Sequence, residues 1–594
     1  MLTKQQKFHF SPRTNKAHLI NWHEWGKEAF EKAKNQGKPV LLSISATWCH
    51  WCHVMDETSY SDEKVIGLIN GEFIPIRVDT DQRPDVNRRY NIGGWPTTVV
   101  LTPTGEILQG GTYIPPHEMY RFLKSIHGYY KEHEDDIYNR IMNNKESQAL
   151  HYNEESPRRI PEDALENTLD FLKNNYDEEY GGFGIQPKFP QPDSLSLLFY
   201  AYYRERDEFV KKILETTLTN MARSGMYDQV EGGFFRYSTT RDWSIPHYEK
   251  MLEDNAALLG VYTNAYLLLD KQEFLETAKD ITRYLVNNLF DDEKGVFWGS
   301  QDADEKYYAL KNLEDRRKRP APFIDKTIYA DWNSMGATAF IKAAFVLKDR
   351  KLYEKAFSVL EFIVSRMFDS QKGVYHFFKE GKPHLSGILK DQVYSVEALL
   401  NGYFASGNEQ YFKKALELGE IILESFYDRQ QGVFVEDKPD FEVMERMGKQ
   451  GEDVPLNGKC CEIMLLLYHL TLREEFKESA QSALECLSAS YLHYGGYAAP
   501  YARAVELFLK GASKLTIVGD KNKTMEYVKK AFSIYVPFRI LEFLDPIEDR
   551  DKIKTLGYEP QKESTAFYCE GKRCFPPITS PNQLDEIFKN RKTR

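Results

Sequence analysis

Two cysteines separated by two residues stand near the start of the chain, in the sequence Cys49-His50-Trp51-Cys52. If this segment forms the first turn of a helix, Cys52 lies one turn after Cys49 on the same face. The positive end of the helix dipole and the unpaired N–H groups of that turn favour a thiolate. We therefore predict that Cys49 attacks disulfides, that Cys52 resolves the mixed disulfide, and that His50 stabilises the thiolate further.

A structural cysteine pair or a metal site is the alternative interpretation of the same residues. Cys49, His50, Cys52 and His53 offer four ligands, but within five residues they cannot converge tetrahedrally on one ion. No second cysteine pair with zinc-like spacing follows nearby in the sequence. We therefore predict redox chemistry, with neither a metal nor another cofactor.

The residues around the motif predict the elements that position it. Strands are expected at residues 39–45, 73–79, 97–102 and 106–114, and helices after Cys52, over residues 84–92 and from His117. This β-α-β-α-β-β-α order is that of the thioredoxin fold. Pro96, in Gly94-Trp95-Pro96-Thr97, resembles the proline that faces the dithiol in thioredoxins and presents backbone to the substrate.

The composition limits the class of protein. With 594 residues the chain is too long for one compact core, and 42% hydrophobic with 28% charged residues is an ordinary globular balance. A net charge of −11 argues against a nucleic-acid partner. The sequence contains no apolar run of about 18 residues that would span a membrane and no apolar signal core at its N-terminus. Seven cysteines are too few for a disulfide scaffold, so we expect a cytoplasmic protein.

A recurring pattern follows a charged linker at residues 131–160. Each copy begins with an aromatic residue followed by an aspartate or a similar turn residue. A glycine and a second aromatic residue follow a few positions later. Copies begin at Tyr176, Tyr227, Phe290, Phe368 and Tyr427, with a weaker sixth copy at His493. Successive copies are 51 to 78 residues apart, which is enough for two helices and two loops. Six such units predict an (α/α)6 toroid over residues 161–512, and an open solenoid of helix pairs is the alternative.

The loops of such a ring gather at one mouth, where carboxylates and aromatic faces would line a cleft. A helix starting at Pro246 would place His247 and Asp254 two turns apart on one face. The candidates for this cleft are Trp243, His247, Glu249, Glu253, Asp254, Asp302, Asp304, Trp332, Asn333 and Asp391. Paired carboxylates, or a histidine with a carboxylate, could act as acid and base on a sugar, and Trp243, Trp298 and Trp332 could stack on its rings. The alternative is that these polar groups only hydrogen-bond neighbouring loops.

From Ser513 the pattern changes to strands around a helix, which predicts a small α/β segment over residues 513–594. Gly519-Asp520 alone is too little for a nucleotide-binding fingerprint. Cys569 and Cys574 flank a turn, and a hairpin disulfide, a relay with the first dithiol and idle thiols all remain open. Cys460-Cys461 begins an apolar helical stretch, so we predict buried packing for this pair.

Several longer motifs carry a resemblance to a known family. They are Trp22-His-Glu-Trp-Gly26, Cys49-His-Trp-Cys-His-Val-Met55, Gly110-Gly-Thr-Tyr113, Pro187-Lys-Phe-Pro190, Pro246-His-Tyr-Glu-Lys-Met-Leu252, Asp302-Ala-Asp304 and Trp332-Asn333. Together they resemble the spermatogenesis-associated protein family with an N-terminal thioredoxin-like domain, over nearly the whole chain. The resemblance implies a thioredoxin-like domain fused to a toroid like those of six-hairpin glycosidases and sugar 2-epimerases. It implies an architecture and leaves the reaction open.

These observations predict a multidomain chain. An α/β thioredoxin-like domain (1–130) is followed by the all-α (α/α)6 toroid and the small C-terminal α/β segment. The favoured function is that of a thiol–disulfide oxidoreductase, with protein thiols or disulfides as partners and a toroid that binds a ligand or partner. One alternative is a carbohydrate-active enzyme of epimerase or glycosidase type, in which the first domain regulates or docks. Another is a non-enzymatic binding scaffold.

Overall fold

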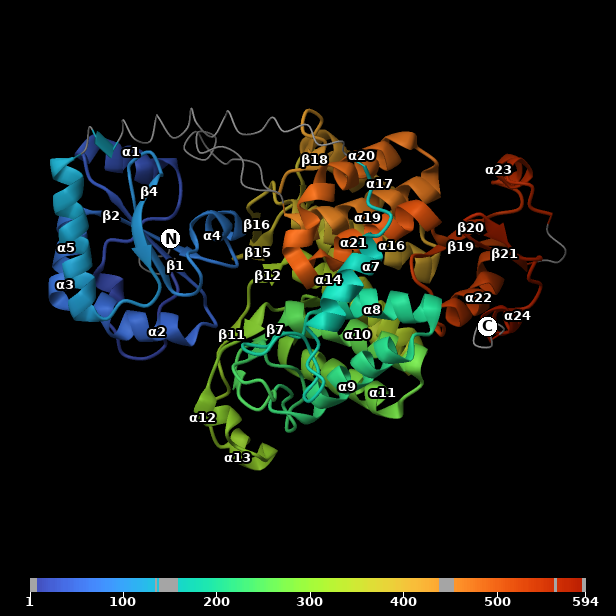
Figure 1. Cartoon of the computed structure of the whole chain (residues 1–594), viewed down its shortest axis with the longest axis horizontal. Coiled ribbons are helices and arrows are strands. Elements are labelled where there is room, and N and C mark those ends of the chain that lie inside the picture. The colour runs from blue at the N-terminus through green and yellow to red at the C-terminus, as the bar shows by residue number, and fades with distance from the viewer. Residues whose placement is uncertain (1–7, 134–135, 138–158, 437–452, 560–563, 590–594) are drawn as a thin grey trace. The chain divides into compact units, whose positions relative to one another are not determined.

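The computed structural model describes residues 8–133, 136–137, 159–436, 453–559 and 564–589 (Figure 1). The chain divides into two compact units, residues 1–157 with 437–451, and residues 158–436 with 452–594. The second unit includes both the predicted toroid and the predicted C-terminal segment, and most of the predicted linker lies outside the described residues. Within the described ranges, no helix is long and apolar enough to cross a membrane.

The first unit is a four-stranded sheet with helices on both faces, which confirms the predicted thioredoxin-like fold. Its strands are β1 (Val40–Ser45), β2 (Ile74–Asp79), β3 (Thr97–Leu101) and β4 (Ile107–Gly111), in the order β2-β1-β3-β4. Strand β1 pairs parallel with β2 and antiparallel with β3, and β3 pairs antiparallel with β4. The helices are α1 (Lys27–Gln36), α2 (His50–Glu57), α3 (Glu63–Glu72), α4 (Pro84–Tyr90) and α5 (Pro116–Glu132), with short 3-10 turns η2 (Ala17–Leu19) and η3 (Ser59–Ser61).

The central strand β1 is buried on both faces because its apolar side chains alternate between two cores. Leu42 and Ile44 pack in one core with side chains of α1 and α4. Leu41 packs in the other core with side chains of α2, α3 and α5. Each buried leucine or isoleucine contributes roughly 1.5–3 kcal/mol. The strand therefore holds the turn that carries the dithiol on a rigid base.

Among the described residues of the second unit, six inner and six outer helices form a closed ring. The inner helices are α8 (Pro192–Glu205), α10 (Leu252–Leu269), α14 (Ala330–Leu347), α16 (Leu389–Ser406), α19 (Val454–Thr471) and α21 (Ala499–Lys510). The outer helices are α7 (Ala164–Asn174), α9 (Glu208–Arg223), α11 (Gln272–Tyr284), α15 (Arg350–Phe362), α17 (Glu409–Ser425) and α20 (Glu474–Cys486). Each inner helix packs against the next, and α21 packs against α8, so the ring closes. The toroid is confirmed, and the open solenoid is wrong.

Short hairpins join the outer helices to the inner ones at the predicted repeats. They are β8 (Phe290–Asp291) with β9 (Val296–Phe297), β13 (Phe368–Asp369) with β14 (Gly373–Val374), and β17 (Tyr427–Asp428) with β18 (Val433–Phe434). Single bridges, Tyr176 to Phe183 and Tyr227 to Phe234, replace them in the first two repeats. The sixth copy forms no such hairpin, because residues Tyr491–Ala498 are a 3-10 helix, η7.

A side-chain amide on the inner helix clamps each hairpin. Asn333 accepts the N–H of Phe297 at 2.8 Å and donates to the carbonyls of Phe297 and Tyr329. Asn255, Gln392 and Asn457 make the equivalent bonds on α10, α16 and α19. Because each amide fixes the start of its inner helix against the hairpin, the residues just before the amide lie at equivalent positions in each of these repeats. Asn333 is therefore a structural residue rather than a ligand-binding one.

Smaller elements complete the mouth of the ring. They are β5 (Tyr237–Ser238), β6 (Pro246–His247), β7 (Lys250–Met251), β10 (Ser300–Gln301), β11 (Ile324–Asp325), β12 (Ile328–Tyr329), β15 (Phe377–Lys379), β16 (Lys382–His384), α12 (Glu305–Tyr308), α13 (Leu313–Arg317), the π-helices η4 (Leu285–Leu289) and η5 (Ile363–Met367), and the 3-10 helix η6 (Leu487–Ala489). The expectation of a helix starting at Pro246 is wrong. Pro246 pairs with Ser238 and Met251 pairs with Ser300, which keeps this stretch extended until α10 begins at Leu252.

The C-terminal segment is a second four-stranded sheet. It contains β19 (Ser513–Gly519), α22 (Lys521–Phe532), β20 (Arg539–Leu544), α23 (Arg550–Thr555), β21 (Ser564–Glu570), β22 (Arg573–Cys574) and α24 (Gln583–Lys589). Its order is β20-β19-β21-β22, with β19 parallel to β20 and antiparallel to β21. This is the strand order and direction of the first unit. The chain therefore holds two sheets of thioredoxin-like topology. The predicted C-terminal α/β segment is confirmed, and the topology of its sheet was not predicted.

Candidate functional site

The dithiol lies at the start of α2, as predicted. Cys49 is the N-cap residue, and its Sγ accepts a hydrogen bond from the N–H of Cys52 at 3.2 Å. The two residues form a disulfide with their Cα atoms 5.3 Å apart, and their exposed fractions are 5% and 2%. This position gives the Cys49 sulfur both a backbone donor and the positive end of the helix dipole, which stabilise a thiolate.

Aromatic residues surround the dithiol. Trp48 is buried, donates to Asp81 at 2.6 Å, and lies with its ring 5.6 Å from that of Trp95. The loop that contains the cis Trp95–Pro96 bond therefore lies beside the motif, where the sequence placed Pro96. Trp51 is 48% exposed and packs on Tyr113, with ring centroids 5.2 Å apart. An exposed apolar surface next to the dithiol is suited to bind a polypeptide.

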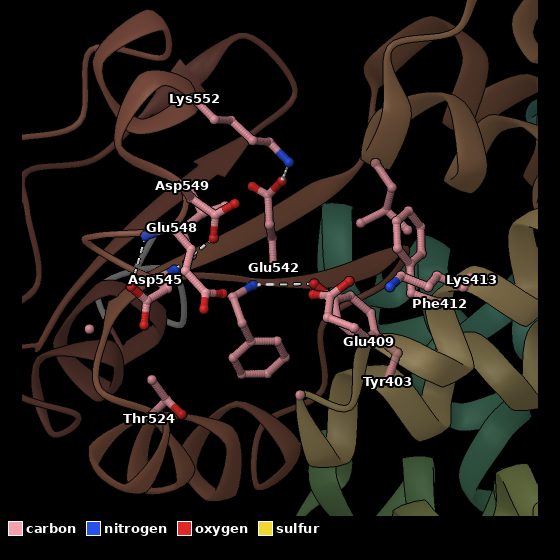
Figure 2. Close-up of a pocket in the computed structure, with 15 residues that line it drawn as sticks. Tyr403, Glu409, Phe412, Lys413, Thr524, Glu542, Asp545, Glu548, Asp549 and Lys552 are labelled. Atoms are coloured by element: carbon pink, nitrogen blue, oxygen red, sulfur yellow. Dashed lines mark hydrogen bonds and ion pairs between the residues drawn. The ribbon is translucent and has the colours of Figure 1, made fainter.

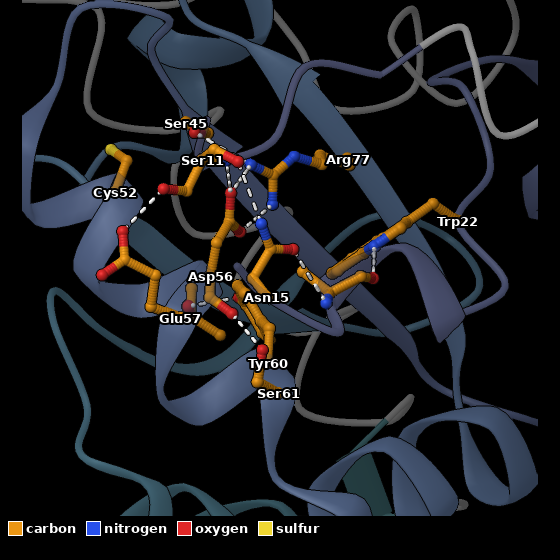
Figure 3. Close-up of polar contacts among 12 residues, drawn as sticks. Ser11, Asn15, Trp22, Ser45, Cys52, Asp56, Glu57, Tyr60, Ser61 and Arg77 are labelled. Carbon is orange, nitrogen blue, oxygen red and sulfur yellow. Dashed lines mark hydrogen bonds and ion pairs between the residues drawn. The ribbon is translucent and has the colours of Figure 1, made fainter. Parts of the chain in front are cut away.

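A buried ion pair anchors α2 to the sheet (Figure 3). Asp56, one turn after Cys52, accepts hydrogen bonds from both terminal nitrogens of Arg77 at 2.8 and 2.9 Å. The N–H of Ser11 donates to the same carboxylate at 3.0 Å, and the side chains of Arg77 and Asp56 are 5% and 1% exposed. This contact was not predicted from the sequence. An arginine inside the otherwise apolar strand at 73–79 was the available signal, because a buried charge needs a partner.

A charged cluster occupies the mouth of the ring, where α10, α14 and α16 begin. Glu253, Asp331 and Lys390 stand at the same position before their clamping amides. Lys390 Nζ lies 2.5 Å from Glu253 Oε1 and 3.1 Å from Asp331 Oδ2. The packing of α10 against α14 and of α14 against α16 thus brings together charges from three successive inner helices, which sequence spacing alone could not establish.

A histidine that the sequence analysis missed completes this cluster. His376 Nδ1 lies 3.0 Å from both carboxylate oxygens of Asp391, and both residues are buried. Its place in the fourth repeat, directly after Gly373-Val-Tyr375, was the only signal in the sequence. Asp331, His376 and Asp391 offer ligand atoms within 4.8 Å of one another. Because the Lys390 ammonium already balances the Asp331 carboxylate, the group is better suited to move protons than to hold a cation.

Asp254 lies next to this cluster, and its pKa is far above the usual value for an aspartate. Burial, with a smaller effect of the nearby Glu253 carboxylate, raises the pKa of Asp254 to about 7, against the opposing effects of Arg236 and Lys390. Among the described residues, its Oδ2 has no hydrogen-bond partner. Asp254 can therefore donate or accept a proton near neutral pH.

His247 pairs with Glu249 rather than with Asp254 along a helix. Its Nδ1 lies 2.7 and 2.8 Å from the two carboxylate oxygens of Glu249, and its ring stacks on Tyr237 with centroids 4.9 Å apart. Burial opposes protonation of this imidazole, but the bond to Glu249 outweighs burial and raises the pKa of His247. His247 is 26% exposed and Glu249 is 1% exposed, so the carboxylate orients an accessible imidazole.

The remaining cleft candidates are buried or hydrogen-bonded to neighbouring backbone groups. Trp243 is fully buried and donates to the carbonyl of Tyr180 at 3.0 Å, and Trp332 is 6% exposed, with its ring against Tyr329. The prediction that Trp243 stacks on a sugar is wrong, because its ring is fully buried, and the same prediction for Trp332 stays untested. Asp304 caps α12 through the N–H of Tyr307, and buried Asp302 accepts the N–H of Ala303.

A separate cavity of about 280 Å³ lies at the second sheet, against α16 and α17 (Figure 2). Its lining carries five carboxylates, those of Glu409, Glu542, Asp545, Glu548 and Asp549, and two amines, those of Lys413 and Lys552. Glu542 accepts hydrogen bonds from Lys514 and Lys552, each at 2.9 Å. This acidic surface would repel phosphate, and we assign no ligand to it.

The fold and the two sites define a thioredoxin-like domain joined to an (α/α)6 toroid. Residues 5–149 match the family model Thioredox_DsbH, whose description is "Protein of unknown function, DUF255". The chain is similar to spermatogenesis-associated protein 20 of Rattus norvegicus, with 27% identity over 96% of this chain and 89% of the relative.

Two further matches concern sugar enzymes. Cellobiose 2-epimerase of Bacteroides fragilis is 34% identical over 97 residues, which are 16% of this chain and 25% of that protein. A solved cellobiose 2-epimerase from Spirochaeta thermophila is 13% identical with a TM-score of 0.47, over 58% of this chain and 96% of that one.

Proposed function

We propose that the first unit is a thiol–disulfide oxidoreductase whose partners are protein thiols or disulfides. The observation that carries the proposal is the position of Cys49 as the N-cap of α2, with its sulfur accepting the N–H of Cys52. The exposed ring of Trp51 and the loop before β3 lie beside it and would receive an extended substrate segment. We propose a cytoplasmic location for this activity, without a nucleic-acid or membrane partner.

The proposed reaction is a two-step exchange. The Cys49 thiolate attacks one sulfur of a substrate disulfide, and the other substrate sulfur leaves as a thiolate. The Cys52 thiolate then attacks the Cys49 sulfur of the mixed disulfide and releases the substrate as a dithiol. Two electrons pass to the substrate, and the Cys49–Cys52 disulfide forms. The reverse sequence oxidises a substrate dithiol.

Trapping tests this proposal. A Cys52→Ser chain should retain its protein partners through a mixed disulfide at Cys49, which thiol reagents release for identification. The matched control is the Cys49→Ser, Cys52→Ser double variant, which should retain none. Equal retention by both variants, together with unchanged insulin reduction by Cys49→Ser, would refute the proposal.

A second candidate function is proton transfer on a carbohydrate at the mouth of the ring. Two observations at the mouth of the ring favour it. Asp391 orients the His376 imidazole, and burial raises the pKa of Asp254 to about 7. The short match to a cellobiose 2-epimerase supports this substrate class. A base and an acid on one sugar would suit epimerisation beside its carbonyl or cleavage of its glycosidic bond.

Separate substitutions distinguish the two functions. Sugar turnover should be lost in His376→Ala, His247→Ala and Asp254→Asn and be unchanged in Cys49→Ser. If Asp254 acts as an acid, turnover should fall as pH rises through about 7, since its carboxyl loses its proton there. If neither set of variants changes any activity while partners are still captured, the scaffold alternative is favoured.

A further inference from the structure

The second sheet carries a disulfide at a different place from the first. Cys569 on β21 faces Cys574 on β22, and the two form a disulfide with their Cα atoms 4.0 Å apart. At the start of α22, where the first sheet has its dithiol, the sequence is Gly519-Asp520-Lys521-Asn522. The cysteine chemistry of this sheet is therefore at its hairpin edge.

The hairpin is held together without this disulfide. The N–H of Gly571, in the turn, donates to the carbonyl of Ala512 at 3.0 Å, and the N–H of Phe575 donates to the carbonyl of Tyr568 at 2.9 Å. The two cysteines are only five positions apart, so the bond closes a short loop and removes little entropy from the unfolded chain. A purely stabilising role is thus a weak explanation for the pair.

The surroundings of the pair make it open to attack. Cys574 is exposed, Cys569 is half-buried, and β22 is the edge strand of the sheet. Lys572 and Arg573 are exposed beside Cys574, and their positive charges favour the approach of a thiolate. By contrast, Cys460 and Cys461 are buried, and burial raises the pKa of both thiols. Exposed disulfides have higher reduction potentials than structural ones and are typically the labile ones.

We propose that Cys569 and Cys574 form a second redox site, a disulfide that is reduced by a thioredoxin-type dithiol. The attacking thiolate bonds to the Cys574 sulfur, and Cys569 leaves as a thiolate. The second thiol of the reducing dithiol, as a thiolate, then attacks the sulfur of the first one in the mixed disulfide, and Cys574 leaves as a thiolate. Two electrons and two protons pass to the pair, and the dithiol becomes a disulfide.

The dithiol has two possible sources, namely Cys49 and Cys52 of this chain, or a separate thioredoxin-type protein. The first source rests on the function proposed above, and the second does not. Two experiments on the full chain separate them.

The first experiment uses the Cys49→Ser, Cys52→Ser chain with thioredoxin, its reductase and NADPH. Maleimide labelling and peptide mass spectrometry measure the thiols of Cys569 and Cys574. We expect complete reduction of the pair, at least about tenfold faster than with equimolar dithiothreitol. This result supports the site whether or not Cys49 is active.

The second experiment uses the Cys52→Ser chain without an added reductase. A cross-linked peptide that joins Cys49 to Cys574 would identify the chain's own dithiol as the source, and Cys574→Ser should abolish it. If this peptide is missing but thioredoxin reduces the pair, the proposal stands with a separate reductant.

Resistance of the pair in both experiments would overturn the proposal. Circular dichroism and thermal unfolding of the Cys569→Ser, Cys574→Ser chain provide the complementary control. Loss of the fold in that variant, together with resistance of the pair to both dithiols, would assign it a structural role only.

Discussion

The two sheets of this chain share one topology and differ in where their cysteines lie. Strands β2-β1-β3-β4 and β20-β19-β21-β22 have the same order and directions. In the first sheet both cysteines of the disulfide lie at the first turn of the helix that follows the central strand. In the second sheet the two cysteines lie on the two strands of an edge hairpin. The same strand arrangement therefore occurs twice in the chain, and a few residues at one turn decide which chemistry it can carry.

A second difference concerns the charge buried on the neighbouring strand. Arg77 is the fourth residue of β2 and lies opposite Ser43, and Glu542 is the fourth residue of β20 and lies opposite Thr516. The first sheet neutralises its charge with Asp56, one turn after Cys52, and thereby fixes the dithiol helix. The second sheet neutralises its opposite charge with two partly exposed lysines.

The largest expected effect separates the two disulfides. Cys49→Ser should reduce insulin-reduction activity by a factor of about 1,000, because it removes the attacking nucleophile. Cys574→Ser should change that activity by less than about twofold. Equal losses in the two variants would contradict the assignment of the first sheet as the oxidoreductase.

The next effect is on stability. Arg77→Met should destabilise the first unit by roughly 3–5 kcal/mol, since it leaves the Asp56 carboxylate buried without its partner. Lys514→Met should cost about 1 kcal/mol or less, because Lys552 still pairs with Glu542. Hydrogen exchange of the β2 and β20 amides in urea, read by mass spectrometry, measures both. A smaller effect for Arg77→Met than for Lys514→Met would show that the ion pair does not anchor α2.

Acid should weaken the second sheet through Glu542. Burial opposes ionisation of this carboxyl group, but Lys514 and Lys552 outweigh burial and lower the pKa of Glu542 below its usual 4.5. The unfolded chain therefore takes up this proton at a higher pH than the folded chain does. The stabilisation is present above about pH 4.5 and is lost as the pH falls through the folded pKa.

The Glu542→Gln chain is the matched control for this pH dependence. The free energy of opening of the β19 and β20 amides, obtained from exchange rates corrected for the intrinsic pH dependence of amide exchange, should fall less steeply from pH 6 to pH 3 in the variant than in the unchanged chain. The same pH dependence in both chains would show that other carboxyl groups control the acid stability of the sheet.

The smallest effect concerns substrate binding. Trp51→Ser should raise the KM for a polypeptide disulfide by about three- to tenfold and leave kcat unchanged, because the exposed ring contributes binding rather than chemistry. Ile547, which is 85% exposed near the second sheet, offers a matched apolar control in Ile547→Ser. Equal KM values for the two variants would exclude Trp51 from the substrate surface.

Local features were predictable from the sequence. The apolar run before Cys49 and the cysteine spacing each act within a few residues, so they predicted β1 and the start of α2. The aromatic-Asp-Gly repeat predicted the ring because it recurs in each hairpin, where a glycine such as Gly295 adopts a positive φ of 70°.

Long-range contacts were not predictable. The pairing of Arg77 with Asp56 depends on strand order, and that of Lys390 with Glu253 and Asp331 depends on how successive inner helices pack. Trp243 was misjudged because a carbonyl 63 residues earlier in the chain receives its N–H, which fixes the ring in the interior. His376 was missed because its candidate role depends on the hydrogen bond to Asp391, which lies on another element.

The reactivity of the Cys49 thiol tests most directly whether the first unit carries an active dithiol. The pH dependence of iodoacetamide alkylation should be measured residue by residue on the fully reduced chain. Half-maximal reaction of Cys49 is expected at least about one pH unit below the value of 8.5 for a free cysteine, because the N-cap position stabilises the thiolate. Reaction of Cys49 at about pH 8.5 or above would contradict the claim that the first turn of α2 creates an active dithiol.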